Sequence, residues 1–234
     1  MARARQRGLR SKEIPMQQFA STLNPLTLLA LGAVTLVIPL IAVVGTSFVR
    51  IAVVLNLLRQ AIGAQNVPPT YVLNVVAAAL TVAIMVSPVS EVIALSEKVP
   101  FASVTLANVT DILGKIDGPL VKFMTDNTGP IERDFIEGVR RDHWSDAAKA
   151  RFGDDSLFVI LPAFVMSEVK KGFEIGFLIY IPFVIIDVVV ATIISSLGMS
   201  SVSPNIIGLP LKLLVFVYND GWTRLAENLV GGYF

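Results

Sequence analysis

Long runs of apolar residues without a charged side chain constrain the fold of this chain more than any other feature. Residues 26–49 form such a run, which would extend about 36 Å as a helix at about 1.5 Å per residue. A hydrocarbon core is about 30 Å thick, and only helices and closed barrels satisfy their backbone polar groups inside it. The run therefore predicts a membrane-spanning helix.

The composition also indicates a membrane protein. Of the 234 residues, 54% are hydrophobic and only 16% are charged, and the mean hydropathy is +0.70. A formal net charge of +1, with no grouping of basic residues into a groove, argues against nucleic-acid binding. The chain has no cysteine, which excludes disulfides, thiolate metal sites and cysteine nucleophiles.

The hydrophobic profile predicts an all-α membrane protein with about four hydrophobic segments in kinked helical hairpins. The expected parts are a basic N-terminal segment (1–25), a first helical hairpin (26–90), a polar helical domain (91–156), and a second kinked hairpin with the C-terminal end (157–234). The apolar stretch 157–197 is too long for one span. We expect Pro162, Gly172, Gly176 and Pro182 to kink or break it.

The positive charges near the N-terminus give conflicting signals for topology. The start MARARQRGLRSK resembles a signal peptide, although the following apolar run is longer than a signal h-region and favours an uncleaved span. This basic start predicts a cytoplasmic N-terminus. Arg50 and Arg59, which we place in the turn of the first hairpin, predict a cytoplasmic turn. One intervening span cannot satisfy both signals.

The stretch SEVKKGFEIG, at 167–176, places four charges between two apolar runs. Exposing four charges to lipid would cost on the order of 10 kcal/mol. On a helix, Glu168 precedes Lys171 by three residues, Lys170 precedes Glu174 by four, and Lys171 precedes Glu174 by three. We therefore expect the cluster to neutralise itself largely through these local pairs. A wet turn between two short membrane helices is the alternative.

Further small or charged residues lie within apolar sequence. Gly172 and Gly176 have the G-x-x-x-G spacing that lets a second helix approach closely. Arg50, Asp187 and Lys212 are each isolated among apolar residues, so each needs a partner or water. A salt bridge between Asp187 and Lys212 that only joins two helices and a direct functional role are equally compatible with this pattern.

Enzyme chemistry has little support in the sequence. The chain contains no phosphate-binding loop of the form G-x-x-x-x-G-K-[ST], no H-E-x-x-H and no G-x-S-x-G. His143 lies in the polar sequence RRDHWSD, where a solvated side chain is the simpler interpretation. We expect no catalysis, no metal site and no cofactor.

Four long motifs of the sequence are distinctive: TSFVRIAVVLNLLRQAIGAQNVPPTYVLN (46–74), MVSPV (85–89), LPAFVMSEVKKGFEIGFLIYIPFVIIDVVVATIISSLGMSSVSP (161–204) and LPLKLLVFVYNDGW (209–222). They resemble the FliP/SctR family of type III secretion export-apparatus proteins. The segment RQAIGAQNVPP and the DGW ending are more similar to the injectisome branch of the family.

The resemblance implies a core pore-forming subunit of the export gate, which passes unfolded proteins across the bacterial inner membrane. It implies a homo-pentamer in a ring or helical funnel that projects to the periplasmic side. The implied partners are the small S and T gate subunits, with the U switch protein and the V export-gate protein nearby. In such a funnel the charges of 167–176 can face other subunits or a polar lumen. The first-hairpin turn would be cytoplasmic and the region 91–155 periplasmic.

The loop LGMSSVSP departs from the pattern of the family it resembles. The family commonly has a methionine-rich loop here, acting as a soft gasket, whereas this chain retains Met199 beside Ser200 and Ser201. The resemblance implies that Met199, Ser200, Ser201 and Val202 lie at the pore. A secondary transporter whose charges bind a small solute or couple ions is the alternative function that the residues leave open.

Overall fold

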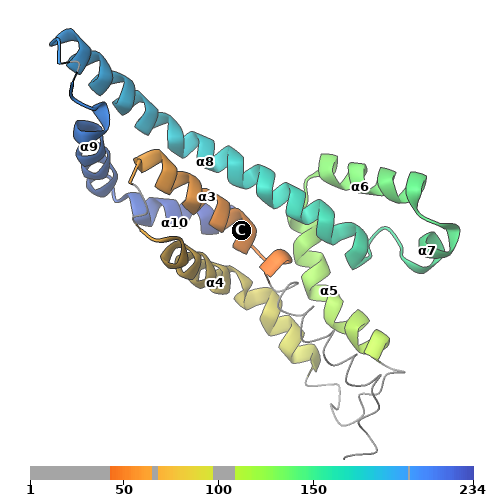
Figure 1. Cartoon of the computed structure of the whole chain (residues 1–234). Helices are drawn as coiled ribbons and strands as arrows, with labels where there is room; N and C mark the ends of the chain where they lie inside the picture. The colour runs from red at the N-terminus through yellow and green to blue at the C-terminus, as the bar shows by residue number, and fades with distance from the viewer. Residues whose placement is uncertain (1–42, 65–67, 97–108, 200) are drawn as a thin grey trace, which may run out of the picture. The chain divides into compact units, whose positions relative to one another are not determined.

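The computed structural model describes residues 43–64, 68–96, 109–199 and 201–234, and these residues are helical with no strand among them (Figure 1). The expectation of an all-α protein is confirmed. Residues 43–234 form one compact unit. Its helices are α3 (Phe48–Ile62), α4 (Thr70–Ser96), α5 (Val109–Asn127), α6 (Pro130–His143), α7 (Asp146–Arg151), α8 (Leu157–Ser196), α9 (Pro204–Tyr218) and α10 (Gly221–Gly231).

Helix α3 lies at the centre of the unit and packs chiefly on α8, with further contacts to α4 and α9. Its apolar residues recur every three or four positions, and Ile51, Val54 and Leu58 are almost completely buried. The prediction that Arg50 and Arg59 lie in a hairpin turn was wrong, because this periodic stripe makes residues 48–62 a helix. The helix ends at Gly63, whose φ of 80° is a left-handed conformation typical of glycine after a helix.

Helix α8 runs without a break through 40 residues, which is about 60 Å at about 1.5 Å per residue. The prolines and glycines therefore do not break the segment, and the alternative of a wet turn at 167–176 was wrong. The expected kinks stay a prediction. Pro162 and Pro182 each remove one backbone hydrogen bond. The packing of α3, α5, α6 and α9 along α8 offsets that loss.

The polar region continues the same unit and packs on the first half of α8. Helices α5 and α6 both contact α8, and Met124 of α5 is buried with Ile160 and Phe164 of α8. Phe123 approaches Phe164 edge to face, with 5.9 Å between ring centroids. These contacts join the polar segment to the apolar helix.

Helices α8 and α9 form a hairpin whose tip lies at residues 197–203. Gly198 has a φ of 69°, which lets the chain reverse directly after α8. Near the base, Phe183 of α8 and Phe216 of α9 share a buried cluster with Leu225 and Leu229 of α10. The last two helices are thereby packed against α3 and α8.

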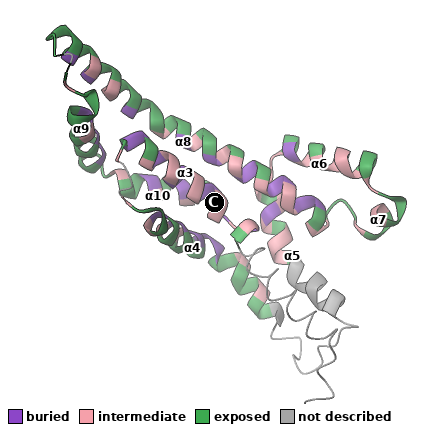
Figure 2. Ribbon diagram, viewed as in Figure 1, coloured by how far each residue is buried: buried purple, intermediate pink, exposed green. Residues whose placement is uncertain are grey.

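Two helices of the described residues are long and apolar enough to cross a membrane: Thr70–Ala94 and Leu157–Ser196. Most of their apolar surface is not covered within the unit, as the exposed residues along α4 and α8 in Figure 2 show. Helix α9 is apolar but shorter. Residues 26–42 of the first expected span, 26–49, lie outside the described residues, and its last two residues begin α3.

Candidate functional site

A buried ion pair joins the first turn of α3 to the first half of α8. Arg50 Nη2 contacts Glu168 Oε1, and the two side chains are only 2% and 0% exposed. Arg50 Nη1 also donates to the carbonyl oxygen of Gly232 at 3.3 Å. Either charge buried alone would cost several kcal/mol. The close packing of α3 on α8 therefore depends on both members of the pair.

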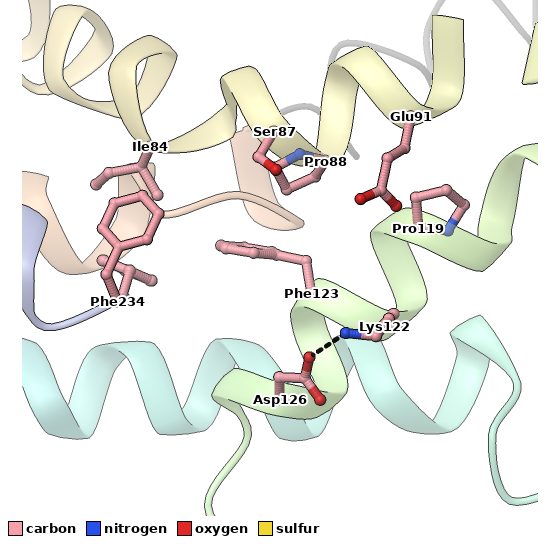
Figure 3. Close-up of a pocket in the computed structure, with 10 residues that line it drawn as sticks. Ile84, Ser87, Pro88, Glu91, Pro119, Lys122, Phe123, Asp126 and Phe234 are labelled. Atoms are coloured by element: carbon pink, nitrogen blue, oxygen red, sulfur yellow. Dashed lines mark hydrogen bonds and ion pairs between the residues drawn. The ribbon is translucent and has the colours of Figure 1, made fainter. Parts of the chain in front are cut away.

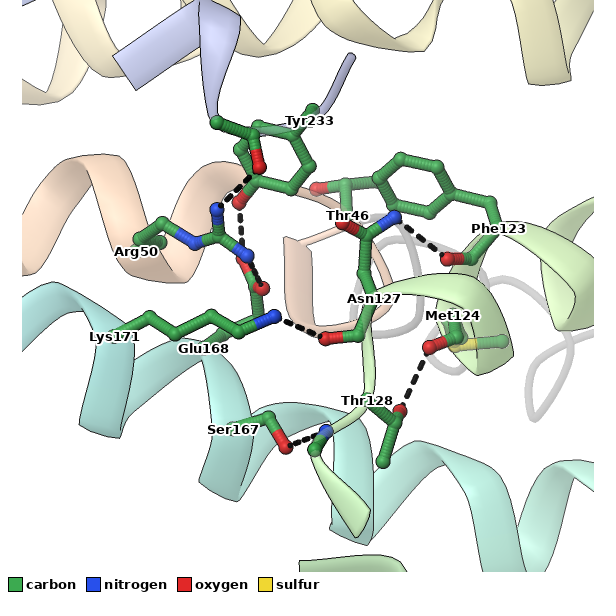
Figure 4. A network of polar contacts seen from close by, with 12 residues as sticks. Thr46, Arg50, Phe123, Met124, Asn127, Thr128, Ser167, Glu168, Lys171 and Tyr233 are labelled. Carbon is green, nitrogen blue, oxygen red and sulfur yellow. Dashed lines mark hydrogen bonds and ion pairs between the residues drawn. The ribbon is translucent and has the colours of Figure 1, made fainter. Parts of the chain in front are cut away.

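Tyr233, close to the C-terminus, completes this pair. Its hydroxyl donates to Glu168 Oε2, and the Arg50 guanidinium carbon lies 3.8 Å from the centroid of its ring (Figure 4). The ring also stacks on Phe123 of α5, with 5.8 Å between centroids. We call Arg50, Glu168 and Tyr233 the Arg50 cluster. Through it, the residues after α10 are fixed to α3, α5 and α8.

The lysines of the charged stretch also have partners on other segments. Lys170 Nζ lies 3.0 Å from Glu132 Oε1 of α6, and Lys171 Nζ donates to the backbone carbonyl of Asn127 at 2.7 Å. The prediction of a self-neutralising stretch was therefore wrong, because tertiary partners replace the local pairs. Glu174 is exposed and forms no ion pair with any residue in the described ranges.

Helix α6 begins against α8 through two polar contacts. The backbone N–H of Gly129 donates to Ser167 Oγ at 2.8 Å, and Glu132 in the first turn of α6 pairs with Lys170. The hydrogen bond from Lys170 holds the pKa of the Glu132 carboxyl below its usual range. Since that pKa is lower than in an unfolded chain, the pair stabilises the fold at neutral pH. Its contribution is lost as the pH falls through the lowered pKa.

The two glycines of the G-x-x-x-G spacing face α3, as expected. A Cβ atom added to Gly172 would lie 3.1 Å from Val53 Cβ and 3.3 Å from the carbonyl oxygen of Arg50. At Gly176 an added Cβ would overlap the side chain of Leu57. The prediction of close helix packing here is confirmed, and the partner is α3. We call the contact of these two glycines with α3 the glycine seam.

A second polar cluster ties the far end of α3 to the α8–α9 hairpin. Lys212 Nζ lies 2.6 Å from Asp187 Oδ2 and donates to the carbonyl oxygen of Ala61 at 3.0 Å. A Cβ at Gly208 would lie only 3.3 Å from Asp187 Oδ1, so a glycine leaves room for the carboxylate. The predicted Asp187–Lys212 pair is confirmed. We call Lys212, Asp187 and the Ala61 carbonyl the Lys212 cluster.

The Lys212 cluster predicts an asymmetric response to neutralisation. Asp187→Asn leaves the Lys212 ammonium, which is 5% exposed, with the Ala61 carbonyl, whereas Lys212→Met leaves an Asp187 carboxylate that is 45% exposed and so less desolvated by the fold. We expect the first change to lower stability by about 3 kcal/mol and the second by about 1 kcal/mol. The double variant should recover most of the loss, measured by thermal unfolding of detergent-purified protein. Additive losses would show that the two residues act separately.

The hairpin tip extends beyond the Lys212 cluster and carries the predicted pore residues. Met199 is 42% exposed, Ser201 is exposed and Val202 is half-buried, while Ser200 lies outside the described residues. Leu197 is also exposed at this tip. The tip thus presents apolar side chains that no described residue of the same chain covers.

A cleft of about 170 Å³ lies between α4 and α5 and is closed on one side by the C-terminal residues (Figure 3). Phe123 and Phe234 point into the space beneath α4, and Lys122 pairs with Asp126 at 3.0 Å on the rim. Tyr233 and Phe234 line this cleft together with residues of α4 and α5, so the last residues of the chain lie between these two helices.

The predicted site residues fall into separate groups in the structure. Arg50 and Glu168 come together at one end of α3, and Asp187 and Lys212 at the other. Arg59 joins neither group and instead donates from Nη1 to Thr70 Oγ1 at 2.8 Å.

Sequence reasoning missed the partners supplied by less apolar segments. These are Tyr233 on Glu168, Glu132 on Lys170 and the Asn127 carbonyl on Lys171. Only Glu132 carried a signal, as an acidic residue at the start of an amphipathic helix. A tyrosine near the C-terminus and a backbone carbonyl are not distinctive in a sequence.

The two clusters are suited to holding helices together rather than to chemistry. Within the described part of the chain, no group of three or more histidine, cysteine or acidic side chains could hold a metal ion. The charged groups of the two clusters are already bound to one another, so no free nucleophile and base face a common space. The arrangement fixes α3, α8 and α9 and leaves the hairpin tip uncovered.

Comparison with known proteins identifies related sequences over nearly the whole chain. The model of the FliP family matches residues 30–229. The chain is 40% identical to Yop proteins translocation protein R of Yersinia pestis, covering 88% of this chain and 94% of the relative. It is 39% identical to harpin secretion protein HrcR of Erwinia amylovora and 34% identical to virulence protein YscR of Salmonella typhimurium. Each of these alignments covers 90% of this chain and 97% of the relative.

Proposed function

The chain belongs to the FliP family, and from this premise we propose that it is a membrane-embedded, pore-forming subunit of an injectisome export gate. The observation that carries the proposal is the match, over nearly full length, to relatives named for translocation and secretion. In this role the protein passes unfolded proteins across the inner membrane and catalyses no reaction. Its polar region, 91–156, faces the periplasm.

The distribution of charge and exposed apolar surface supports this role. The charges of the Arg50 and Lys212 clusters are satisfied within the chain, so the outer faces of α4 and α8 are largely apolar. Such faces suit contact with lipid or with neighbouring subunits. We propose that the neighbours are further copies in a pentamer and the S and T gate subunits, with the U and V proteins nearby.

A secondary transporter has less support. A transporter of this kind would use intramembrane acidic residues to bind a solute or a coupling ion. Glu168 is instead held by Arg50 and Tyr233, and Asp187 by Lys212.

The experiment that tests the proposed function has two parts. The tagged full-length chain is expressed with its neighbouring secretion genes, and the detergent-extracted complex is sized and its subunits are identified. A strain that lacks the chain is then assayed for secretion, with and without the chain restored. We expect a large multisubunit complex and secretion that depends on the chain. A monomer or dimer that supports ion-driven solute uptake in vesicles would contradict the proposal.

The hairpin tip is proposed as the resting seal of the gate. A channel that passes an unfolded chain must exclude ions when idle, which requires an adaptable apolar constriction. One methionine per subunit becomes a continuous collar when it is repeated around a ring. Met199, assisted by Val202, is the candidate for this collar, while Ser200 and Ser201 weaken it.

This proposal predicts that Met199→Ala raises the resting ion leak of cells several-fold without reducing the yield of the complex. The substitution shortens the collar but leaves α8 and α9 intact. Met166→Ala is a matched control, because both methionines are 42% exposed and Met166 lies far from the tip on α8. Methionine at 200 and 201 should tighten the resting state. An unchanged leak for Met199→Ala at equal yield would place the seal elsewhere.

A further inference from the structure

A groove of about 520 Å³ lies between the middle of α8 and α10. Most of its wall is apolar, from Ile175 and Leu178 of α8, Phe216 of α9 and Leu225 of α10. Arg224, also on α10, is part of the lining. The groove therefore offers an apolar surface with a cation in it.

Arg224 has no ionic partner in the described part of the chain. Its side chain is exposed and forms no ion pair or hydrogen bond there, although Glu227 follows it by one helical turn. A guanidinium beside an apolar wall loses hydration when the groove is covered, and an anion on the covering surface would offset that cost. An occupant of the groove should therefore combine apolar side chains with one carboxylate.

The outer side of α8 has this composition. Phe177 and Ile181 are 66% and 41% exposed, and Phe173 is 55% exposed. Among them lies the exposed Glu174, which is the only charged residue in residues 172–186. A carboxylate on an apolar ridge matches a guanidinium in an apolar groove, in charge and in polarity.

We propose that the ridge formed by Phe173, Glu174, Phe177 and Ile181 of one copy seats in the groove of a second copy, with Glu174 paired to Arg224. The inference rests on the proposed function, because it requires the chain to assemble with itself. The ridge and the groove are different patches, so the contact is heterologous and generates a ring or a helical array rather than a closed dimer. In this contact Glu174, which forms no ion pair with the described residues of its own chain, gains a cationic partner on the second copy.

Cysteine cross-linking tests this contact directly, because the natural chain contains no cysteine. The double variant Glu174→Cys/Arg224→Cys is expressed in the complete complex in membranes and treated with a short bismaleimide. We expect a ladder of covalent multimers of the chain. Each single-cysteine variant should remain mainly monomeric on a denaturing gel. The pair Glu174→Cys/Glu227→Cys is a control, since Glu227 does not line the groove.

Cross-linking within one chain would give no ladder and would overturn the proposal. The same holds if no cross-link forms in a complex that is otherwise assembled. If the wild-type chain is monomeric in the complete secretion background, the proposed function fails together with this contact. If the complex has its normal size but no ladder forms, the proposed contact is contradicted and the proposed function is not.

Charge reversal supplies a second, independent measurement. Glu174→Arg and Arg224→Glu should each lower the yield of the complex about tenfold, because like charges then meet at the contact between the two copies. Co-expression of the two singly reversed chains should restore much of the yield, since each chain meets the opposite charge on its neighbour. Rescue only when both changes are in one chain would place the pair within a chain and overturn the proposal. Wild-type yield for both single variants would overturn it as well.

Discussion

Arg50→Met is expected to abolish accumulation of the folded protein, with a loss of about 3–5 kcal/mol of stability. The change removes the cation that contacts Glu168 and leaves a fully buried carboxylate with the Tyr233 hydroxyl as its remaining partner. It also removes the guanidinium that lies over the Tyr233 ring and binds the Gly232 carbonyl. The end of α10 should therefore detach together with α3. Membrane-fraction yield, protease resistance and secretion measure the effect.

Two further variants separate this effect from the loss of any arginine. Arg59→Met is the matched control on the same helix and should cost less than about 1 kcal/mol, because the one hydrogen bond of the Arg59 side chain to a described residue is with the Thr70 hydroxyl. The double variant Arg50→Met/Glu168→Met removes both buried charges and should recover much of the yield. If Arg50→Met behaves like Arg59→Met, the buried pair does not hold α3 on α8.

The Lys212 cluster was predictable because its two charges are isolated on consecutive apolar segments. Consecutive helices joined by a short turn are antiparallel neighbours, so Asp187 and Lys212 had few other partners. The distance of 2.6 Å between Lys212 Nζ and Asp187 Oδ2 agrees with that reasoning. The contact to the Ala61 carbonyl was not predictable, because it depends on where α3 ends.

The Arg50 cluster shows where local reasoning fails. Glu168 has lysines two and three residues along the same helix, yet its partner Arg50 is 118 residues away in the sequence. An exposed pair on one helix is worth only about 0.2–0.5 kcal/mol, whereas a fully buried carboxylate must have a cation beside it. Burial therefore decided the pairing, and burial of Glu168 follows from the glycine seam rather than from its own neighbours in the sequence.

The continuity of α8 was mispredicted for a related reason. Proline and glycine weaken an isolated helix, and Pro162, Gly172, Gly176 and Pro182 together suggested breaks. In the fold, the two glycines face α3, where the absence of a side chain permits contact. Packing of other helices along α8 outweighs the lost backbone hydrogen bonds. The two glycines thus allow close packing where a partner helix is present, although they would weaken the same helix in isolation.

The glycine seam and the two polar clusters hold α3 against α8, and the Lys212 cluster does so through Lys212 of α9. Arg50 binds Glu168 at the start of α3, Gly176 contacts Leu57 in the middle, and the Ala61 carbonyl binds Lys212 at the end. Helix α3 is thereby held to α8 along its length, which fixes the base of the α8–α9 hairpin. The proposed seal at Met199 would require such a base, because movement at the base would shift the hairpin tip.

Gly176→Ala should therefore have a large effect for the addition of a single methyl group. The new Cβ would overlap the Leu57 side chain; even Leu57 Cβ and Cγ, which rotation about the outer side-chain bonds cannot displace far, would lie 3.0 and 3.2 Å away. Helices α3 and α8 would have to separate, which also strains the Arg50–Glu168 pair. We expect a loss of about 3 kcal/mol, the upper part of the range for overpacked cores. Thermal unfolding of the detergent-purified protein and secretion measure it.

Two further variants show whether the overlap with Leu57 causes the loss of stability in Gly176→Ala. Gly138→Ala adds the same methyl group to α6, where the new Cβ would meet only the end of the Arg141 side chain, at an ordinary contact distance of 3.7 Å, and should be neutral or stabilising by up to about 1 kcal/mol. Combining Gly176→Ala with Leu57→Ala removes Leu57 Cγ and Cδ1, which include the nearest of the crowding atoms, and should restore part of the lost stability. If Gly176→Ala is as stable as Gly138→Ala, the glycine seam tolerates a side chain and the glycine is not required for close packing. If the double variant is instead less stable than Gly176→Ala alone, the overlap with Leu57 does not cause the loss. Strain elsewhere on α8 would then account for the destabilisation by Gly176→Ala.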